Sequence, residues 1–496
     1  ANPNPRGRVS KWVALQSPGS GEPRPAVGAH APARAPLSRE APAVAQQDAN
    51  VRASKECAPA SLCKPESTNV SDFGSFRVTE LRLEDMCKAP RSAMPNTLKP
   101  VFNTLEGATP AIHKALVQLE AAVREAMLPP SESAADLRVY SGAAGVGLMF
   151  YSLHTAIADR QERTQYRQYA QQYGQACAAS VATDTADEVG SDISFLHGKA
   201  GVHAVAAVNA YMAEGKRPCK MHVDRVLALQ KLALEGDVAD SLMYGRAGYL
   251  YALLFINRST GRGMVPATVV KEVANKILAD GRAGAVSCPE SSLMWSTKPP
   301  TSPLGCLHGL AGILYVLLEA REYLTPADLS DIAGAVGYVL MQTERGFEGA
   351  NGPWATPKAQ WCDGAAGLVL LFCKSHSTLR MPQCLKAAKR IASEVVWEHG
   401  LLLGGVGLCH GLSGTILCLL AVYNATNDQA WLDKALACAM FLIDSNPMQL
   451  LDGTAATLYP DTSPAPYSLF GGAAGAAVAL GQLLAGTALF PALDCP

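Results

Sequence analysis

The sequence has almost no net charge, and this lack limits the partners that we expect. Its 42 Lys and Arg residues stand against 43 Asp and Glu residues, so the formal net charge of the 496-residue chain is −1 at pH 7. A protein that binds nucleic acid through the phosphates needs a basic surface. The composition therefore favours no nucleic-acid partner.

A disulfide framework is also missing. The 14 cysteines are not spaced densely or regularly. Most of them lie singly in apolar segments with helical patterns, as Cys177, Cys373, Cys418 and Cys438 do. Small secreted domains have dense and regular spacings, whereas isolated cysteines suit a reducing compartment. We predict a cytoplasmic protein.

No apolar run in the sequence is typical of a membrane span. The longest segment with few polar residues, 469–490, contains Gln482, Thr487 and many small residues. A transmembrane helix needs about 20 consecutive, predominantly apolar residues. We interpret this stretch as the last buried helix of the fold.

What the sequence does contain is a repeat. A Gly-x-x-Gly turn followed by an apolar helical run occurs seven times, with leading glycines 47 to 64 residues apart. Chance explains one such turn in a chain with 43 glycines, but not seven with the same continuation. The leading glycines are Gly142, Gly198, Gly245, Gly309, Gly364, Gly411 and Gly472.

Amphipathic, charged segments alternate with these apolar runs, and the alternation predicts the fold. In the first charged segment, Ile112, Leu116, Leu119 and Val123 recur at helical spacing and share one face. The runs after the turns are apolar nearly all round, so we expect them to be buried. We predict an all-α fold over residues 96–496. It is an α/α toroid of seven outer and seven inner helices, with the glycine turns at the inner helix starts.

Residues 1–95 have a different character. Pro, Ala, Ser, Gly and Arg dominate, acidic residues are sparse, and no apolar periodicity is visible. Such a segment cannot bury enough apolar surface to fold. We predict a disordered tail, and an organelle-targeting segment is the alternative interpretation.

Two of the turns carry residue types that bind metals. Cys409 and His410 stand directly before the sixth turn, and Cys362 holds the same place before the fifth. Cys and His are the usual ligands of zinc, and three protein donors leave the fourth tetrahedral position open, as in catalytic sites. A single Cys or His is more often a packed core residue, so the repeat is what favours a site. It brings these residues to one end of the ring, where His308 and His197 precede other turns.

These motifs closely resemble those of the lanthionine synthetase C-like proteins, the eukaryotic relatives of the bacterial lantibiotic cyclases. The resemblance covers residues 105–490 and rests on segments 240–250, 307–312, 361–364 and 409–411. It implies a seven-fold toroid that holds one zinc ion through Cys362, Cys409 and His410. It also implies that the zinc activates a thiol, glutathione in the eukaryotic members. The thiol then adds to dehydroalanine or dehydrobutyrine in a peptide or damaged protein.

The chemistry of the residues agrees with this activity. A thiol of pKa about 8.5 is mostly protonated at neutral pH, and coordination to zinc deprotonates it. Addition of the sulfur leaves an enolate that must be protonated. The resemblance implies this acid–base role for His308, which has a suitable pKa range, and a supporting role for Asp240. Without the resemblance, His308 is interpreted as a packed histidine and Asp240 as a solvated charge at a helix N-terminus.

Two basic residues are candidates for contacts with glutathione. Lys358 stands four residues before Cys362, where the cyclases carry an arginine, and it keeps the charge without the bidentate geometry. Arg246 lies at the third turn, where it either contacts a carboxylate or forms a salt bridge at the helix end. Glutathione-binding members often carry a lysine where this chain has Gly404.

Two other functions are weighed against the enzyme. A scaffold that binds zinc and glutathione and regulates a signalling partner such as a kinase would not require His308. A glycoside hydrolase needs two carboxylates beside a sugar cleft, and only Asp363 and Asp240 lie near the turns. Family members have also been discussed at membranes, so peripheral membrane association is a further expectation. We expect a monomer.

The tail can be tested by truncation. Because residues 1–95 lack the pattern needed to bury a core, a chain that begins at residue 96 should keep its melting temperature and its metal content. Calorimetry and elemental analysis of both chains measure this. A large fall in melting temperature on truncation would show that the tail packs on the toroid.

Overall fold

The computed structural model describes residue 98 and residues 104–130, 136–183, 193–261, 263–296, 303–348, 358–399, 405–445 and 465–495. All of them belong to one compact unit, Gly74–Pro496. The predicted tail, residues 1–95, lies outside the described residues, so its disorder and its boundary stay predictions.

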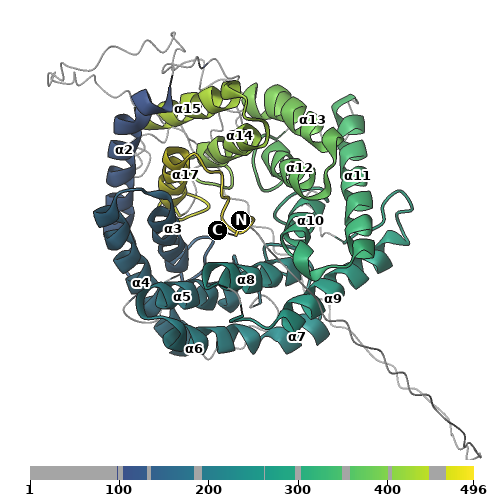
Figure 1. Cartoon of the computed structure of the whole chain (residues 1–496), viewed down its shortest axis with the longest axis horizontal. Helices are drawn as coiled ribbons and strands as arrows, with labels where there is room; N and C mark the ends of the chain where they lie inside the picture. The colour runs from purple at the N-terminus through teal and green to yellow at the C-terminus, as the bar shows by residue number, and fades with distance from the viewer. Residues whose placement is uncertain are drawn as a thin grey trace, which may run out of the picture. The chain divides into compact units, whose positions relative to one another are not determined.

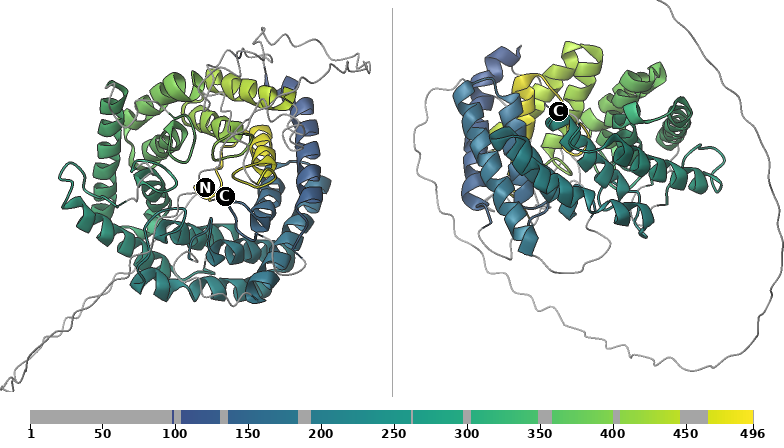
Figure 2. Two further views of the ribbon diagram at one scale, coloured as in Figure 1. Left: turned by 180° about the vertical axis from the view of Figure 1, so that it is seen from behind. Right: turned by 60° about the horizontal axis from the view of Figure 1, so that its bottom comes forward.

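The described residues form two concentric layers of helices, as Figure 1 shows, and Figure 2 gives the same ring from behind. The inner layer has seven helices: α3 (Ala143–Ala156), α5 (Lys199–Glu214), α8 (Arg246–Ser259), α10 (Leu310–Glu319), α12 (Ala365–Leu379), α14 (Leu412–Thr426) and α17 (Ala473–Ala485). No strand occurs in this part of the chain.

The outer layer follows the same order around the ring. It consists of α2 (Leu105–Ala126), α4 (Arg160–Thr183), α6 (Lys216–Leu227) with α7 (Gln230–Glu235), α9 (Ala267–Ala285), α11 (Pro326–Glu348), α13 (Pro382–Ile391) and α15 (Gln429–Asp444). The 3-10 turn η1 (Arg321–Tyr323) precedes α11, and the π-helical η2 (Ala392–Trp397) continues α13. The last inner helix, α17, packs against α2 and α3, which closes the ring. The predicted α/α toroid is confirmed.

The helices of the outer layer are buried on one face, whereas those of the inner layer are buried on nearly all sides. In α2, the predicted face of Ile112, Leu116, Leu119 and Val123 is fully buried, while Glu106 and Lys114 are exposed. In α10, every residue is buried. Amphipathic helices therefore form the wall against solvent, and helices that are apolar all round form the core. None of the described helices has the length and apolarity that a membrane crossing requires.

The glycine turns have one shared geometry. The leading glycine is the N-cap of each inner helix, with negative φ throughout. The loop before the helix folds back over it, so the N–H of Leu310 donates to the carbonyl of Pro303 at 2.9 Å. A Cβ on the second glycine, Gly312, would lie 1.8 Å from the carbonyl oxygen of Cys306. The glycines therefore provide space for a close backbone approach, not a left-handed conformation.

Hydrogen bonds link the seven loops before the inner helices into a closed ring, which we call the turn belt. Six of the links join one backbone to the next, and the seventh uses a serine hydroxyl. The links run from Tyr140 N–H to Leu196 O, Ser194 Oγ to Met243 O, Met243 N–H to Leu307 O, Leu307 N–H to Cys362 O, Trp361 N–H to Cys409 O, Cys409 N–H to Phe470 O, and Phe470 N–H to Tyr140 O, at 2.7 to 3.2 Å.

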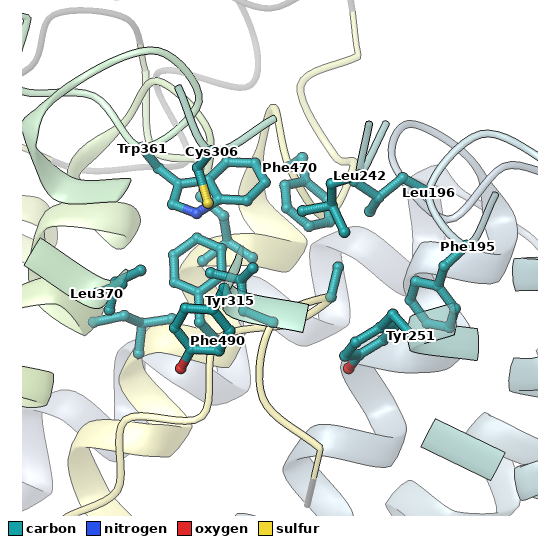
Figure 3. Close-up of a cluster of buried hydrophobic side chains, with 14 of the residues drawn as sticks. Phe195, Leu196, Leu242, Tyr251, Cys306, Tyr315, Trp361, Leu370, Phe470 and Phe490 are labelled. Atoms are coloured by element: carbon teal, nitrogen blue, oxygen red, sulfur yellow. The ribbon is translucent and has the colours of Figure 1, made fainter. Parts of the chain in front are cut away.

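Aromatic side chains fill the space below the turn belt. Figure 3 shows Trp361 beside Phe470 and Phe490. The indole of Trp361 stacks on Phe490 at 4.9 Å between ring centroids and lies 5.4 Å from Phe470. The segment that follows α17 enters the ring here, and the hydroxyl of Tyr315 donates to Asp494 at 2.6 Å. Residues 469–490 thus form the last inner helix and part of this core, as predicted.

The role of the turn glycines can be tested with two matched substitutions. Gly312→Ala places a methyl group against the backbone of its own loop, so we expect a loss of more than about 3 kcal/mol of stability, beyond ordinary overpacking. Gly337, inside α11, has no atom within 4 Å of an added Cβ. Gly337→Ala should stabilise the protein by up to about 1 kcal/mol through helix propensity. Urea unfolding curves measure both, and equal midpoints for Gly312→Ala and wild type would contradict the account.

Candidate metal centre

Three side chains meet where the loops before α12 and α14 lie side by side. The Sγ atoms of Cys362 and Cys409 and a ring nitrogen of His410 all lie within 4.8 Å of one another. The Sγ of Cys362 is 3.4 Å from Nε2 of His410. Both cysteines are buried, whereas His410 is exposed. In the described part of the chain, this is the one group of three Cys, His, Asp or Glu residues that has a metal-binding arrangement.

The turn belt holds these residues together. The N–H of Trp361 donates to the carbonyl of Cys409 at 3.1 Å, and the N–H of Cys409 donates to Phe470 at 2.9 Å. On the other side, the carbonyl of Cys362 accepts from Cys306 at 2.7 Å and from Leu307. Each cysteine is therefore fixed through its own backbone, so the two thiols face each other although 47 residues separate them in sequence.

The electrostatics of the cluster favour a bound cation. Hydrogen bonds from Cys409 and His410 lower the pKa of the Cys362 thiol against the effect of burial. Burial and the neighbouring Cys362 raise the pKa of Cys409, and the contact with Cys362 raises the pKa of His410. A divalent ion would compensate two thiolates in this buried place. Two sulfur donors and one imidazole nitrogen are also a donor set that zinc prefers, so the residues fit zinc.

His308 stands before the neighbouring inner helix, α10, and is half-buried. Its ring lies 5.6 Å from the ring of Tyr244. Burial lowers the pKa of His308, and the nearby carboxylate of Asp363 opposes this shift. Asp363 follows Cys362 directly, and its charge acts on both His308 and His410. His308 is thus close to the cluster but is not one of its members.

His197 lies further along the same rim. Its ring meets Tyr244 edge-on at 5.0 Å, and its Nε2 is 2.7 Å from a guanidinium nitrogen of Arg138. The sequence predicted that His197 and His308 would gather with the three ligands. The structure places both histidines on the turn side of the ring, but neither joins the compact cluster.

Asp240 and Arg246 lie together in a largely buried network of hydrogen bonds and ion pairs. Arg246 is 4% exposed, and its guanidinium donates to the carbonyls of Ala233, Val238 and Gly236. It also pairs with Asp240 at 3.1 Å and with Asp280 of the outer helix α9 at 3.3 Å. Burial raises the pKa of Asp240 to about 6 even though Arg246 opposes the shift. This arrangement favours the helix-end salt bridge over contact with a ligand.

Lys358 keeps its place beside the cluster. It lies in the loop before α12, four residues before Cys362, and its side chain is exposed. Its charge lies close enough to His410 to lower the pKa of that imidazole. An exposed ammonium at this place is accessible to a carboxylate of a small ligand. Gly404, the other position compared with the family, lies outside the described residues.

Two residues near the cluster were not assigned roles from the sequence. The carbonyl of Tyr140 accepts from the N–H of Phe470 at 3.2 Å, and the carbonyl of Phe470 accepts from the N–H of Cys409 at 2.9 Å. The Oδ1 atom of Asp363 is buried without a hydrogen-bond partner among the described residues, and it lies where a Cβ on Gly305 would be 2.7 Å away. The position of Asp363 directly after the candidate ligand Cys362 could have indicated from the sequence that it lies near the site. For Tyr140, only its position in the first turn of the repeat could have indicated proximity to the site.

The fold and the site together define a class of protein, a helical toroid with a two-cysteine, one-histidine centre among its inner turns. The family model described as lanthionine synthetase C-like protein matches residues 133–495. The chain belongs to this family.

Individual relatives agree with this assignment. The LanC-like protein GCL1 of Arabidopsis thaliana is 30% identical over 366 residues, which cover 71% of this chain and 79% of the relative. The glutathione S-transferase LANCL1 of Danio rerio is 29% identical over 357 residues, or 70% of this chain and 82% of the relative. The structure of nisin cyclase is similar with a TM-score of 0.50 at 15% identity, over 76% of this chain and 94% of that one. The last likeness concerns the fold alone.

Metal content tests the cluster directly. Elemental analysis should find about one zinc ion per chain, and Cys362→Ala or Cys409→Ala should lower the content sharply because each removes one of three protein donors. Cys418→Ala is the matched control, since Cys418 is equally buried but lies within α14, away from the cluster. Full zinc content in both ligand variants would overturn the assignment.

Proposed function

We propose that this protein is a zinc-dependent enzyme that adds the thiol of glutathione to dehydroalanine or dehydrobutyrine residues in peptides or damaged proteins. The observation that carries the proposal is the cluster of Cys362, Cys409 and His410, with His308 on the adjacent loop. The name of the Danio rerio relative, a glutathione S-transferase, supports glutathione as the thiol.

The three ligands are suited to the first half of the reaction. Cys362, Cys409 and His410 would hold zinc through two thiolates and one imidazole, and the ion would supply a lowered pKa to a thiol that binds beside them. His410 is the exposed ligand, so the open side of the cluster faces solvent. A small thiol can reach this side, whereas the buried Cys362 and Cys409 are shielded from exchange.

His308 is suited to the second half. The thiolate sulfur bonds to the β-carbon of the dehydroamino acid, and the electron pair of the carbon–carbon double bond moves toward the α-carbon and its carbonyl. A proton must then be delivered to the α-carbon, so that the net result is addition of sulfur and hydrogen. Burial lowers the pKa of His308 and the carboxylate of Asp363 opposes this shift, so the half-buried imidazole is suited to give up a proton as well as to take one.

The binding of glutathione is assigned to the exposed rim. Lys358 offers a positive charge beside His410, and a glutathione carboxylate would pair with it. An exposed pair of this kind contributes up to about 1 kcal/mol. Arg246 and Asp240 are already paired with each other, so we assign them to the support of α8 and not to the reaction.

A reducing environment fits this chemistry. The cysteines in the described part of the chain are free, and most are buried. Glutathione is a substrate only where it is abundant and reduced, so we propose that the protein acts in the cytoplasm.

Two histidine variants separate an enzyme from a binding scaffold. His308→Ala should keep zinc and glutathione binding but lose the addition by on the order of 10²–10⁴-fold, the usual contribution of a positioned acid or base. His410→Ala should lose metal and reaction together. Metal analysis and the mass of a dehydroalanine peptide incubated with glutathione measure both effects in the same samples.

His197→Ala serves as the control, since His197 precedes an equivalent turn but lies further along the rim. It should retain most of the activity. If His308→Ala adds glutathione as fast as wild type, the acid–base assignment is wrong. If wild type adds none to the peptide, the scaffold that regulates a signalling partner becomes the better account.

A further inference from the structure

We propose that Tyr244 is a specificity-determining residue of the site. Its ring packs against the acceptor peptide at the dehydroamino acid and selects the face of the α-carbon that receives the proton. The inference rests on the addition reaction of the proposed function and deepens it, because it assigns the side of the site that holds the acceptor. The thiol is assigned to the opposite side, at His410 and Lys358.

Tyr244 holds the same place in its repeat as three residues of the site. It stands directly before the leading glycine of the third turn, as His308, Asp363 and His410 stand before those of the next three turns. Equivalent positions on adjacent loops therefore follow one another along the rim, from the metal ligand His410 to Tyr244. The turn belt joins these loops in that order, through Met243 N–H to Leu307 O at 3.1 Å, Leu307 N–H to Cys362 O at 3.0 Å, and Trp361 N–H to Cys409 O at 3.1 Å.

The side chain of Tyr244 adjoins the proposed acid–base residue. Its ring centroid lies 5.6 Å from that of His308, and the two ring planes are tilted by 34°. The backbone of the preceding residue, Met243, bonds to the loops on either side. The N–H of Tyr244 itself donates to the Oγ of Ser241 at 3.3 Å. A well-fixed loop thus presents the aromatic ring next to His308.

Tyr244 is also accessible, with 40% of its surface exposed. Single exposed aromatic residues are common on protein surfaces, so exposure alone indicates nothing. In the described part of the chain, however, Tyr244 is the one exposed large apolar side chain in a loop of the turn belt. The others lie in or directly after outer helices, at Val117, Leu128, Met221 and Val286. A rigid tyrosine ring in this position is typical of an anchor for a ligand.

A dehydroamino acid has a shape that such a ring recognises. Its α- and β-carbons share a double bond conjugated with the carbonyl, so the unit is flat, unlike the saturated residues beside it. Flat unsaturated groups pack well against aromatic rings. The ring therefore favours the reactive residue over its neighbours in the peptide.

The position of the ring also bears on the second half of the reaction. The thiolate sulfur bonds to the β-carbon, the π electrons move toward the α-carbon and its carbonyl, and the α-carbon becomes tetrahedral when His308 delivers a proton. The face that receives the proton fixes the configuration of the product. Because Tyr244 and His308 are adjacent, a flat unit held on the ring turns one face to the imidazole. Without the ring, either face is open to protonation.

The test compares Tyr244→Ala, which removes the ring, with Tyr244→Phe, which removes only the hydroxyl. Met221→Ala is the matched control, since Met221 is an exposed apolar side chain of the outer helix α6. The full chain is loaded with zinc and incubated with glutathione and a dehydroalanine peptide. The KM for the peptide, the glutathione Kd and the zinc content are measured. Acid hydrolysis of the product and chiral chromatography give the ratio of LL to meso lanthionine, which reports the configuration of the new α-carbon.

We expect Tyr244→Ala to raise the KM for the peptide by about 10–30-fold, the usual effect of losing one aromatic anchor. Zinc content and glutathione Kd should stay unchanged, and the single diastereomer formed by wild type should become a mixture. Tyr244→Phe and Met221→Ala should keep the wild-type KM and the single diastereomer.

Three outcomes would overturn the inference alone. The first is a wild-type KM and a single diastereomer in Tyr244→Ala, and the second is a mixture of diastereomers from wild type. The third is a loss of zinc and of melting temperature in Tyr244→Ala with the configuration unchanged, which is what a merely structural role produces. A wild-type chain that adds no glutathione to the peptide would overturn the proposed function, and the inference with it.

Discussion

The turn belt is the constraint on which the rest of the structure depends. Seven loops, each before an inner helix, are joined in a closed circle by hydrogen bonds from one to the next. The closing link runs from Phe470 in the last repeat to Tyr140 in the first. A buried backbone N–H without a partner costs about 1–3 kcal/mol. Loops that carry such groups therefore cannot move outward independently, and the side chains that they bear keep fixed relative positions.

The metal ligands use this constraint. Cys362 and Cys409 have backbone groups that are themselves links of the belt, so the distance between their thiols is set by the same bonds that close the ring. The aromatic core below, with Trp361 stacked on Phe490, supports the loop from the other side. The hydrogen bonds that close the ring therefore also position the metal ligands, without any additional contacts. A substitution that disrupts the ring should weaken metal binding as well.

The sequence predicts features that the repeated Gly-x-x-Gly turns determine. It does not predict contacts that occur in only one of the repeats. The fold and the meeting of Cys362, Cys409 and His410 could be predicted because seven equivalent turns place equivalent positions together. The buried network of Arg246 could not, because its acceptors are carbonyls whose directions depend on the path of the loop. Tyr140 was missed for a related reason. Its link to Cys409 passes through Phe470 and exists only once the ring is closed.

X-ray absorption at the zinc edge tests the central claim most directly. The account predicts two sulfur neighbours at about 2.3 Å and one protein nitrogen at about 2.0–2.1 Å, with a light atom in the fourth position. On addition of glutathione, a third sulfur should enter the shell while the protein nitrogen remains, since the thiol takes the open position. A shell of nitrogen and oxygen only, or a sulfur count that stays at two under saturating glutathione, would contradict the account.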